Sequence, residues 1–228
     1  MSLGLFTRRP SAVFFDLDGT LADSAAGLAD CANDMRIARN LAALPFHELR
    51  PAVGSGARGM LGVAFSVMPG HGDFAELRDE FLQRYEQRMM EKTRLFDEVN
   101  PMLDRLDQIG MPWGIVTNKA LRFAQPMTAA LGLVPRTKIL VGGDSTAHTK
   151  PHPAPLLEAA RQLGVMPEQC VYVGDDLRDM QAGRAAGMTT LAAAWGYLGH
   201  GANVDEWGAD LVLLTPNMLF ECLDLDLA

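Results

Sequence analysis

Two aspartates stand two residues apart after an apolar run near the N-terminus. The stretch AVFFDLDGTLADS holds Asp16 and Asp18, and an extended backbone there places both carboxylates on one side of the chain. Two anions this close raise each other's pKa unless a cation lies beside them. A D-x-D pair alone is typical of a solvated turn, but a hard cation such as Mg²⁺ prefers such oxygen ligands.

Polar side chains recur after other apolar runs. Thr117, Asn118 and Lys119 follow GIV, Lys150 precedes PHP, and Asp175, Asp176 and Asp179 follow CVYVG. These clusters supply hydroxyl and amide donors, a cation and further carboxylates. Lys119 is as consistent with a solvent-facing side chain as with a catalytic one.

The elements that position these clusters are short continuous apolar runs, which are typical of strands buried on both faces of a sheet. We expect strands over 11–16, 112–117, 138–143, 170–174 and 189–195, with helices over 121–132, 153–164 and 177–187. This alternation predicts an α/β fold with a doubly wound parallel sheet. In such sheets ligands bind beyond the carboxyl ends of the strands, which is where all the polar clusters fall.

Residues 22–94 break this alternation with helical stretches and no convincing strand. From Phe74 to Met89, apolar residues recur at spacings of three and four, as on one face of a helix. We therefore expect an α-helical domain of residues 22–94 inserted into a core domain of residues 1–21 and 95–228.

The stretch VGSGARG within this insertion contains the spacing G-x-G-x-x-G. A dinucleotide-binding turn requires a buried strand directly before it, and the preceding PFHELRPA does not read as one. We expect Gly54 and Gly56 to form a turn at a helix start. Arg58 would lie in the first turn, where it can bind a carboxylate or phosphate; a plain junction between loop and helix fits equally well.

Charge and composition limit the classes of binding partner that this chain can have. The formal net charge is −8 and no Lys/Arg run is present, so we expect no nucleic-acid partner. No segment approaches the roughly 18 apolar residues of a membrane span. The N-terminal residues lack the signal-peptide pattern, and the three cysteines show no metal or disulfide spacing. These features favour a cytoplasmic protein that acts on a small molecule.

In this order, the motifs DLDGT, VTN, the lysine before PHP, and GDDLRD resemble the haloacid dehalogenase-like hydrolase superfamily, in its phosphatase branch. The resemblance covers nearly the whole chain. It implies a Rossmann-like core, with residues 22–94 as its helical cap domain, and Mg²⁺ as the cofactor.

The same resemblance implies a role for each motif residue. Asp16 would be the nucleophile that forms a phosphoaspartate, and Asp18 the general acid and base. The phosphate would be bound by Thr117, Asn118 and Lys150, and Mg²⁺ by Asp16, Asp175 and the backbone carbonyl of Asp18. Asp179 would orient Lys150 or a metal-bound water. Independently of the resemblance, Asp176 lies where an acid caps the following helix, and Gly54 and Arg58 would let the cap bind a substrate that carries a carboxylate.

Alternatives stay open on the reaction and the substrate. Dehalogenases of the superfamily lack a residue like Asp18, but sugar phosphomutases share every core residue. A non-catalytic binding module would be expected to lack Asp16 or Lys150. VGSGAR and KPHPAPLL resemble phosphoglycolate phosphatases, whereas SGARGM and WGIVTNK resemble N-acetylmuramic acid 6-phosphate phosphatases. Both proposed substrates are small phosphorylated metabolites with a carboxylate. The oligomeric state is open.

Overall fold

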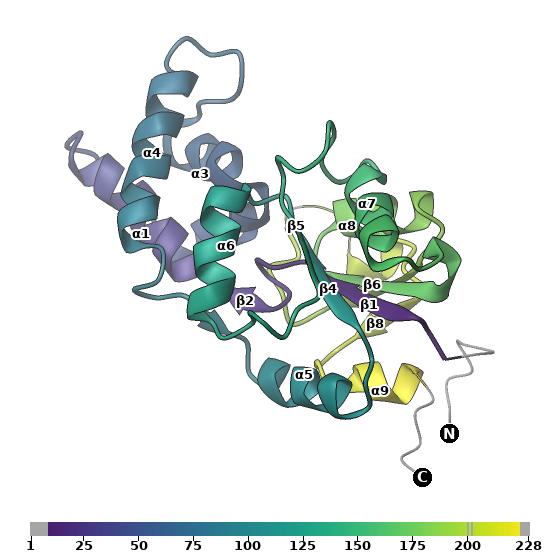
Figure 1. The fold of residues 1–228 in the computed structure, drawn as a ribbon. Coiled ribbons are helices and arrows are strands. Elements are labelled where there is room, and N and C mark those ends of the chain that lie inside the picture. Colours follow the sequence, from purple (N-terminus) through teal and green to yellow (C-terminus); the bar gives the residue numbers. More distant parts are fainter. Residues whose placement is uncertain (1–8, 200, 202, 224–228) are drawn as a thin grey trace.

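The computed structural model describes residues 9–199, 201 and 203–223. In that part of the chain, six strands form one parallel sheet in the order β5-β4-β1-β6-β7-β8 (Figure 1). They span Ala12–Phe15 (β1), Trp113–Val116 (β4), Ile139–Val141 (β5), Cys170–Gly174 (β6), Thr189–Ala193 (β7) and Leu211–Leu213 (β8). The predicted α/β sheet is confirmed. Strand β8 was not predicted, because a three-residue edge strand that is only partly buried carries a short apolar signal.

Helices cover both faces of this sheet, as the continuous apolar strands predict. They span Val99–Gln108 (α5), Leu121–Ala130 (α6), Ala154–Leu163 (α7), Leu177–Ala185 (α8) and Met218–Cys222 (α9), with 3₁₀ turns at Pro167–Gln169 and Val204–Glu206. Along β1, Val13 and Phe15 pack in the cluster that holds α5, α6 and α9. Ala12 and Phe14 pack in the cluster that holds α7 and part of α8. Alternate side chains of one strand thus bury two helical layers.

Between the first strand and the rest of the sheet lies a helical segment. It contains Ala25–Ile37 (α1), Phe46–Leu49 (α2), the 3₁₀ turn Arg50–Ser55 (η1), Gly56–Phe65 (α3) and Phe74–Arg88 (α4). Strands Ala22–Asp23 (β2) and Arg94–Leu95 (β3) pair antiparallel at its two ends. The expectation of helices alone was therefore incomplete, because strands of two residues leave no periodic pattern.

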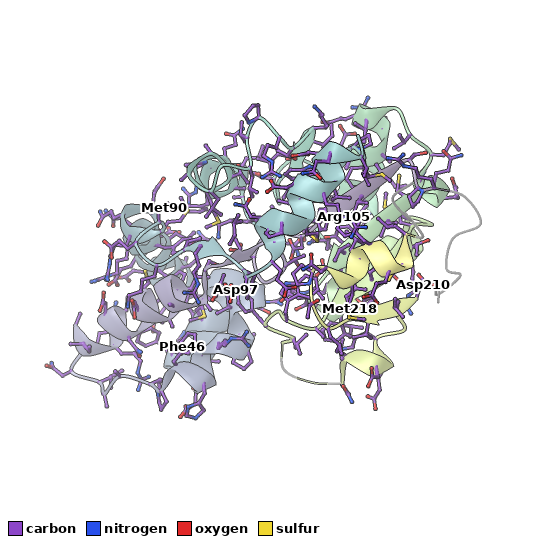
Figure 2. The ribbon with its side chains drawn as sticks, turned by 90° about the horizontal axis from the view of Figure 1, so that it is seen from below. Phe46, Met90, Asp97, Arg105, Asp210 and Met218 are labelled. Carbon is purple, nitrogen blue, oxygen red and sulfur yellow. The ribbon has the colours of Figure 1, made fainter. Side chains whose placement is uncertain are left out.

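The helical segment lies to one side of the sheet. In Figure 1, α1, α3 and α4 lie together at the upper left, whereas α7, α8 and α9 lie to the right. In the view from below, Phe46 and Met90 lie on the left, in the helical segment and at its end. Arg105 of α5 and Met218 of α9 lie on the right, and Asp97 lies between the two groups (Figure 2). The predicted stripe is confirmed: Leu77, Phe81, Tyr85 and Met89 are buried, and Phe74 is partly buried against the same core, with Met89 at the C-terminal end of α4.

The glycine-rich stretch does not follow a strand. It lies where the 3₁₀ turn η1 passes into α3, and Gly56 adopts a positive φ of 57°. The structure confirms the predicted turn at a helix start. Within these described residues no strand directly precedes the glycines, as a dinucleotide-binding turn would require. Among the described residues, no helix is both long and apolar enough to cross a membrane.

Candidate active site

Three neighbouring strands bring the motif residues together. Strands β4, β1 and β6 lie side by side and parallel, so the residues after their carboxyl ends meet at one edge of the sheet. Asp16 follows β1, Thr117 follows β4 and Asp175 follows β6. Gly19 has a φ of 91°, and a Cβ there would overlap the Asp175 carboxylate. The chain therefore turns beside the acidic residues only because this position is glycine.

Lys150 is the buried cation of the site. Its Nζ lies 2.9 Å from Asp16 Oδ1 and 2.7 Å from Asp179 Oδ1, and it donates to the Tyr172 hydroxyl at 2.7 Å. Its side chain is 2 % exposed. A buried ammonium is stable only when paired and hydrogen-bonded, and these contacts meet both conditions. The predicted convergence of Lys150 with Asp16 and Asp179 is observed.

Asn118 holds the loop that carries Lys150. Its Nδ2 donates to the Lys150 carbonyl at 3.0 Å, and its Oδ1 accepts from the Lys150 backbone N–H at 2.9 Å. The side chain is thus engaged with the protein backbone, so any phosphate contact of this residue would come from its backbone N–H. Phosphate binding by Thr117, Asn118 and Lys150 stays a prediction.

The site is short of positive charge. Burial raises the pKa of Asp16 to about 6, although the Lys150 ammonium opposes the shift. Burial and the neighbouring Asp16 and Asp179 raise the pKa of Asp175 well above its usual range. Burial alone would lower the pKa of Lys150, but Asp16 and Asp179 together raise it. Lys150 pairs with Asp16 and Asp179, and Asp175 has no ion pair within the described residues.

The same carboxylates form a possible metal centre. Asp16, Asp175 and Asp179 each offer an oxygen, and these oxygens lie within 4.8 Å of one another. An all-oxygen, anionic donor set suits a hard divalent cation, which would supply the missing charge. Asp179 is already bonded to Lys150, Tyr172 and the Asp176 N–H. Both oxygens of Asp175 also accept hydrogen bonds, from the Thr20 hydroxyl at 3.1 Å and the Tyr197 N–H at 2.8 Å. Within the described residues, Asp16 Oδ2 is the carboxylate oxygen of this cluster that has no hydrogen bond.

Asp18 points to a different set of partners. Its Oδ2 lies 3.0 Å from Lys119 Nζ, and its Oδ1 accepts from Ser24 Oγ at 2.5 Å. Lys119 also donates to the Tyr85 hydroxyl at 3.0 Å, and its side chain is only 9 % exposed. The solvent-facing alternative for Lys119 is wrong, because the ammonium is enclosed between Asp18 and α4.

Asp176 caps α8, as predicted. Its side chain accepts from the Arg178 N–H, and Asp179 completes the capping box. The Arg178 guanidinium bonds Asp176 and donates to the Gly54 carbonyl at 2.7 Å. Arg178 thereby joins α8 to the glycine-rich turn. Sequence reasoning missed this contact, although Arg178 lies inside the GDDLRD motif.

A cavity of about 490 Å³ opens over these residues. Asp16 and Asp18 line it, together with Arg58 of α3 and Arg122 of α6. In the described part of the chain neither guanidinium has an ion pair, and Arg122 stacks only on the Phe123 ring at 4.5 Å. Gly54 and Arg58 thus border the cavity, and their contact with the substrate stays a prediction. Arg122 gave no signal in the sequence.

Comparison with known proteins identifies the family. A model described as haloacid dehalogenase-like hydrolase matches residues 13–193. This chain is a haloacid dehalogenase-like hydrolase. Its curated relatives include a protein named phosphoglycolate phosphatase from Xanthomonas campestris pv. campestris, which is 48% identical over 94% of this chain and 96% of its own. A protein named N-acetylmuramic acid 6-phosphate phosphatase from Pseudomonas aeruginosa is 39% identical over 95% and 96%.

A solved structure agrees with this assignment. The crystal structure described as a predicted phosphoglycolate phosphatase from Haemophilus somnus 129pt matches this hydrolase with a TM-score of 0.84 and 25% identity, over 95% of this chain and 99% of that one. The Rossmann-like core fold of the family is therefore confirmed.

Proposed function

We propose that this hydrolase is a Mg²⁺-dependent phosphomonoester phosphatase that works through a phosphoaspartate on Asp16. The observation that carries the proposal is the convergence of Asp16, Lys150 and Asp175 at the carboxyl ends of neighbouring strands, beside a cavity that Asp16, Asp18 and Lys150 line. Asp16 and Asp175, with the Asp18 carbonyl, would hold Mg²⁺. When bound, the ion would offset the negative charge of the transferring phosphoryl group.

The chain's own residues account for both chemical steps. Asp16 attacks phosphorus while the ester P–O bond breaks, and Asp18 gives its proton to the departing alkoxide. A water then attacks the phosphoaspartate, and Asp18 takes a proton from that water. Inorganic phosphate leaves and the Asp16 carboxylate is restored. Lys150 and Thr117 bind the phosphoryl oxygens.

Residues 22–94 act as the cap domain in this proposal. The helical segment supplies Arg58 and the turn at Gly54 to the cavity, and the core supplies Arg122. Two guanidiniums without a carboxylate partner in the described residues suit a substrate with a second anion besides its phosphate. We therefore propose an acid-bearing phosphorylated metabolite as the substrate. On the strength of the named relatives, 2-phosphoglycolate is the first to assay.

The cavity itself favours a second candidate, N-acetylmuramic acid 6-phosphate. Its volume of about 490 Å³ lies in the range of about 300–1,000 Å³ that is typical for drug-sized ligands, and a two-carbon acid would leave much of it unfilled.

The test is phosphate release from a panel of phosphomonoesters, with Mg²⁺ and with excess chelator. The panel contains both acids, neutral sugar phosphates and p-nitrophenyl phosphate. We expect Mg²⁺-dependent release of inorganic phosphate, fastest from an acid-bearing ester. Positional isomers of a sugar phosphate without free phosphate would identify a mutase instead, and full activity in chelator would contradict the metal requirement.

A further inference from the structure

Lys119 has a defined place that the phosphoryl chemistry above does not use. Its ammonium lies between the Asp18 carboxylate and the Tyr85 hydroxyl, 3.0 Å from each. The same Nζ lies 4.7 Å from the centre of the Tyr85 ring. Two of its three N–H donors are thus engaged, and the side chain is nearly buried.

The two partners of Lys119 belong to different parts of the fold. Asp18 follows β1 in the core, whereas Tyr85 lies on α4 of the helical segment. Tyr85 is 2 % exposed and packs against Phe81 of α4 and Phe123 of α6. The ammonium therefore sits at the junction of the helical segment with the core, beside the carboxylate of the proposed general acid.

The second oxygen of Asp18 is also held. Ser24, the residue before α1, donates its hydroxyl to Oδ1 at 2.5 Å, and the Ser24 N–H donates to the Tyr197 hydroxyl at 2.7 Å. Asp18 is thus fixed at both oxygens, and each contact leads to a helix of residues 22–94. A carboxylate must be placed to within a fraction of an ångström to transfer a proton efficiently.

We propose that Lys119 is a positioning residue: it orients the Asp18 carboxylate and, through Tyr85, makes that orientation depend on α4 being seated on the core. This inference rests on the proposed phosphatase function. Lys119 acts through Asp18, so its effect belongs to proton transfer to the leaving oxygen. Lys150 is the corresponding fixed cation for Asp16.

Leaving-group dependence separates this role from direct phosphate binding. Alkyl esters such as 2-phosphoglycolate and N-acetylmuramic acid 6-phosphate release an alkoxide, which needs the proton of Asp18. p-Nitrophenyl phosphate releases a stable phenolate, which does not. We expect Lys119→Met to lower kcat/KM for the better alkyl substrate by about tenfold to a hundredfold, as for loss of a hydrogen bond to a charged group. The loss for p-nitrophenyl phosphate should be much smaller, and inhibition by inorganic phosphate should be unchanged.

A double-mutant cycle tests the route through Asp18. In an Asp18→Asn background, Lys119→Met should cause no further loss on the alkyl ester, because residues that act as a unit are not additive. Lys119→Arg, which keeps a cation beside Asp18, should restore part of the activity. Tyr85→Phe removes only the hydroxyl and should reproduce a smaller part of the same leaving-group pattern. Lys138→Met, an exposed lysine before β5, is the matched control.

Each outcome decides the question. Equal losses on alkyl and aryl esters with weaker phosphate inhibition would show that Lys119 binds the phosphoryl group, and unchanged kinetics would show that it does nothing; either result overturns the proposal. Where Lys119→Met fails to fold in thermal melting, Tyr85→Phe and Lys119→Arg carry the same comparison. Wild-type protein that releases no phosphate from any ester would overturn the phosphatase function itself, and this inference with it.

Discussion

The proposed reactivity rests on one carboxylate oxygen. Asp16 Oδ1 accepts from the Leu17 N–H and from Lys150, whereas its Oδ2 has no hydrogen bond within the described residues. One oxygen therefore orients the group and the other is available to attack. The flanking Asp175 and Asp179 make the local potential negative, so the reaction requires compensating cations at this point.

Asp16→Asn is expected to lower turnover by about a thousandfold or more, since an amide cannot serve as the nucleophile. The fold should persist, because Lys150 keeps its contacts with Asp179 and Tyr172. Phosphate release and thermal melting measure the two effects. Asp97→Asn, at an exposed position away from the cavity, is the control. Substantial turnover by the Asp16 variant would rule out the phosphoaspartate.

Arg58→Ala and Arg122→Ala test the second anion site. Each is expected to cost about tenfold to a hundredfold in kcat/KM for an acid-bearing substrate, since a charged hydrogen bond contributes about 1.5–3 kcal/mol. The loss should appear mainly in KM, because the contact is made equally in the ground and transition states. p-Nitrophenyl phosphate lacks the carboxylate and should be hydrolysed nearly as by wild type. Equal losses on both substrates would mean that the arginines support folding or cap closure.

Among the secondary-structure elements, the start of α8 and the glycine-rich turn at Gly54 contact each other beside the site. The α8 N-terminus presents Asp176, whose capping box fixes the first helical turn. Arg178 projects from that turn to the Gly54 carbonyl. A Cβ at Gly54 would stand 3.4 Å from Asp176 Oδ2 and 3.6 Å from the Arg178 guanidinium, which is ordinary van der Waals contact, so this approach depends on the Arg178 side chain and not on the absence of a Cβ at Gly54.

Arg178→Ala is expected to loosen the glycine-rich turn from α8. Hydrogen exchange of residues 50–58 should become faster, and KM for the acid-bearing substrate should rise by about tenfold as one charged hydrogen bond is lost. Mass spectrometry of exchange and steady-state kinetics measure these effects. Arg161→Ala, on the exposed face of α7, is the matched control. Unaltered exchange in residues 50–58 would show that other contacts hold the turn.

For the whole molecule, the acidic cluster links metal binding to stability. Asp16, Asp175 and Asp179 are held close together by the fold, so under the proposed function the native state would bind Mg²⁺ more tightly than the unfolded chain does. By mass action, Mg²⁺ at one hundred times its Kd stabilises the native state by about 2.7 kcal/mol. For a chain of this length that corresponds to a rise in Tm of several degrees, at about 2–4 °C per kcal/mol.

Asp175→Asn is therefore expected to abolish the Mg²⁺-dependent rise in Tm, while Asp97→Asn keeps it. The measurement is thermal melting with Mg²⁺ and with chelator, and it does not depend on turnover. The Asn variant should be no less stable than wild type in chelator, because the substitution removes a buried carboxylate that lies beside two others. A wild-type Tm that does not respond to Mg²⁺ would contradict the metal site.

Local patterns in the chain were enough to predict the sheet. They also predicted that the motif residues gather at the carboxyl ends of its strands. Buried strands such as AVFF and CVYVG carry continuous apolar runs, and parallel strands necessarily bring the residues after them together. Asp16, Thr117 and Asp175 could therefore be placed before any coordinates were known. Edge strand β8 and the two-residue strands β2 and β3 could not, because so few residues carry no periodicity.

Only the tertiary structure decided which side chains meet across the site. Tyr85 reads as one more position of an apolar helical stripe, and Tyr172 as a core residue of β6, yet their hydroxyls bond Lys119 and Lys150. Arg122 reads as an exposed residue of α6, yet it lines the same cavity as Arg58. Such pairings join residues tens of positions apart, and they depend on how the helical segment packs on the sheet. No local spacing encodes that packing, because side-chain contacts between distant elements are set by the whole fold.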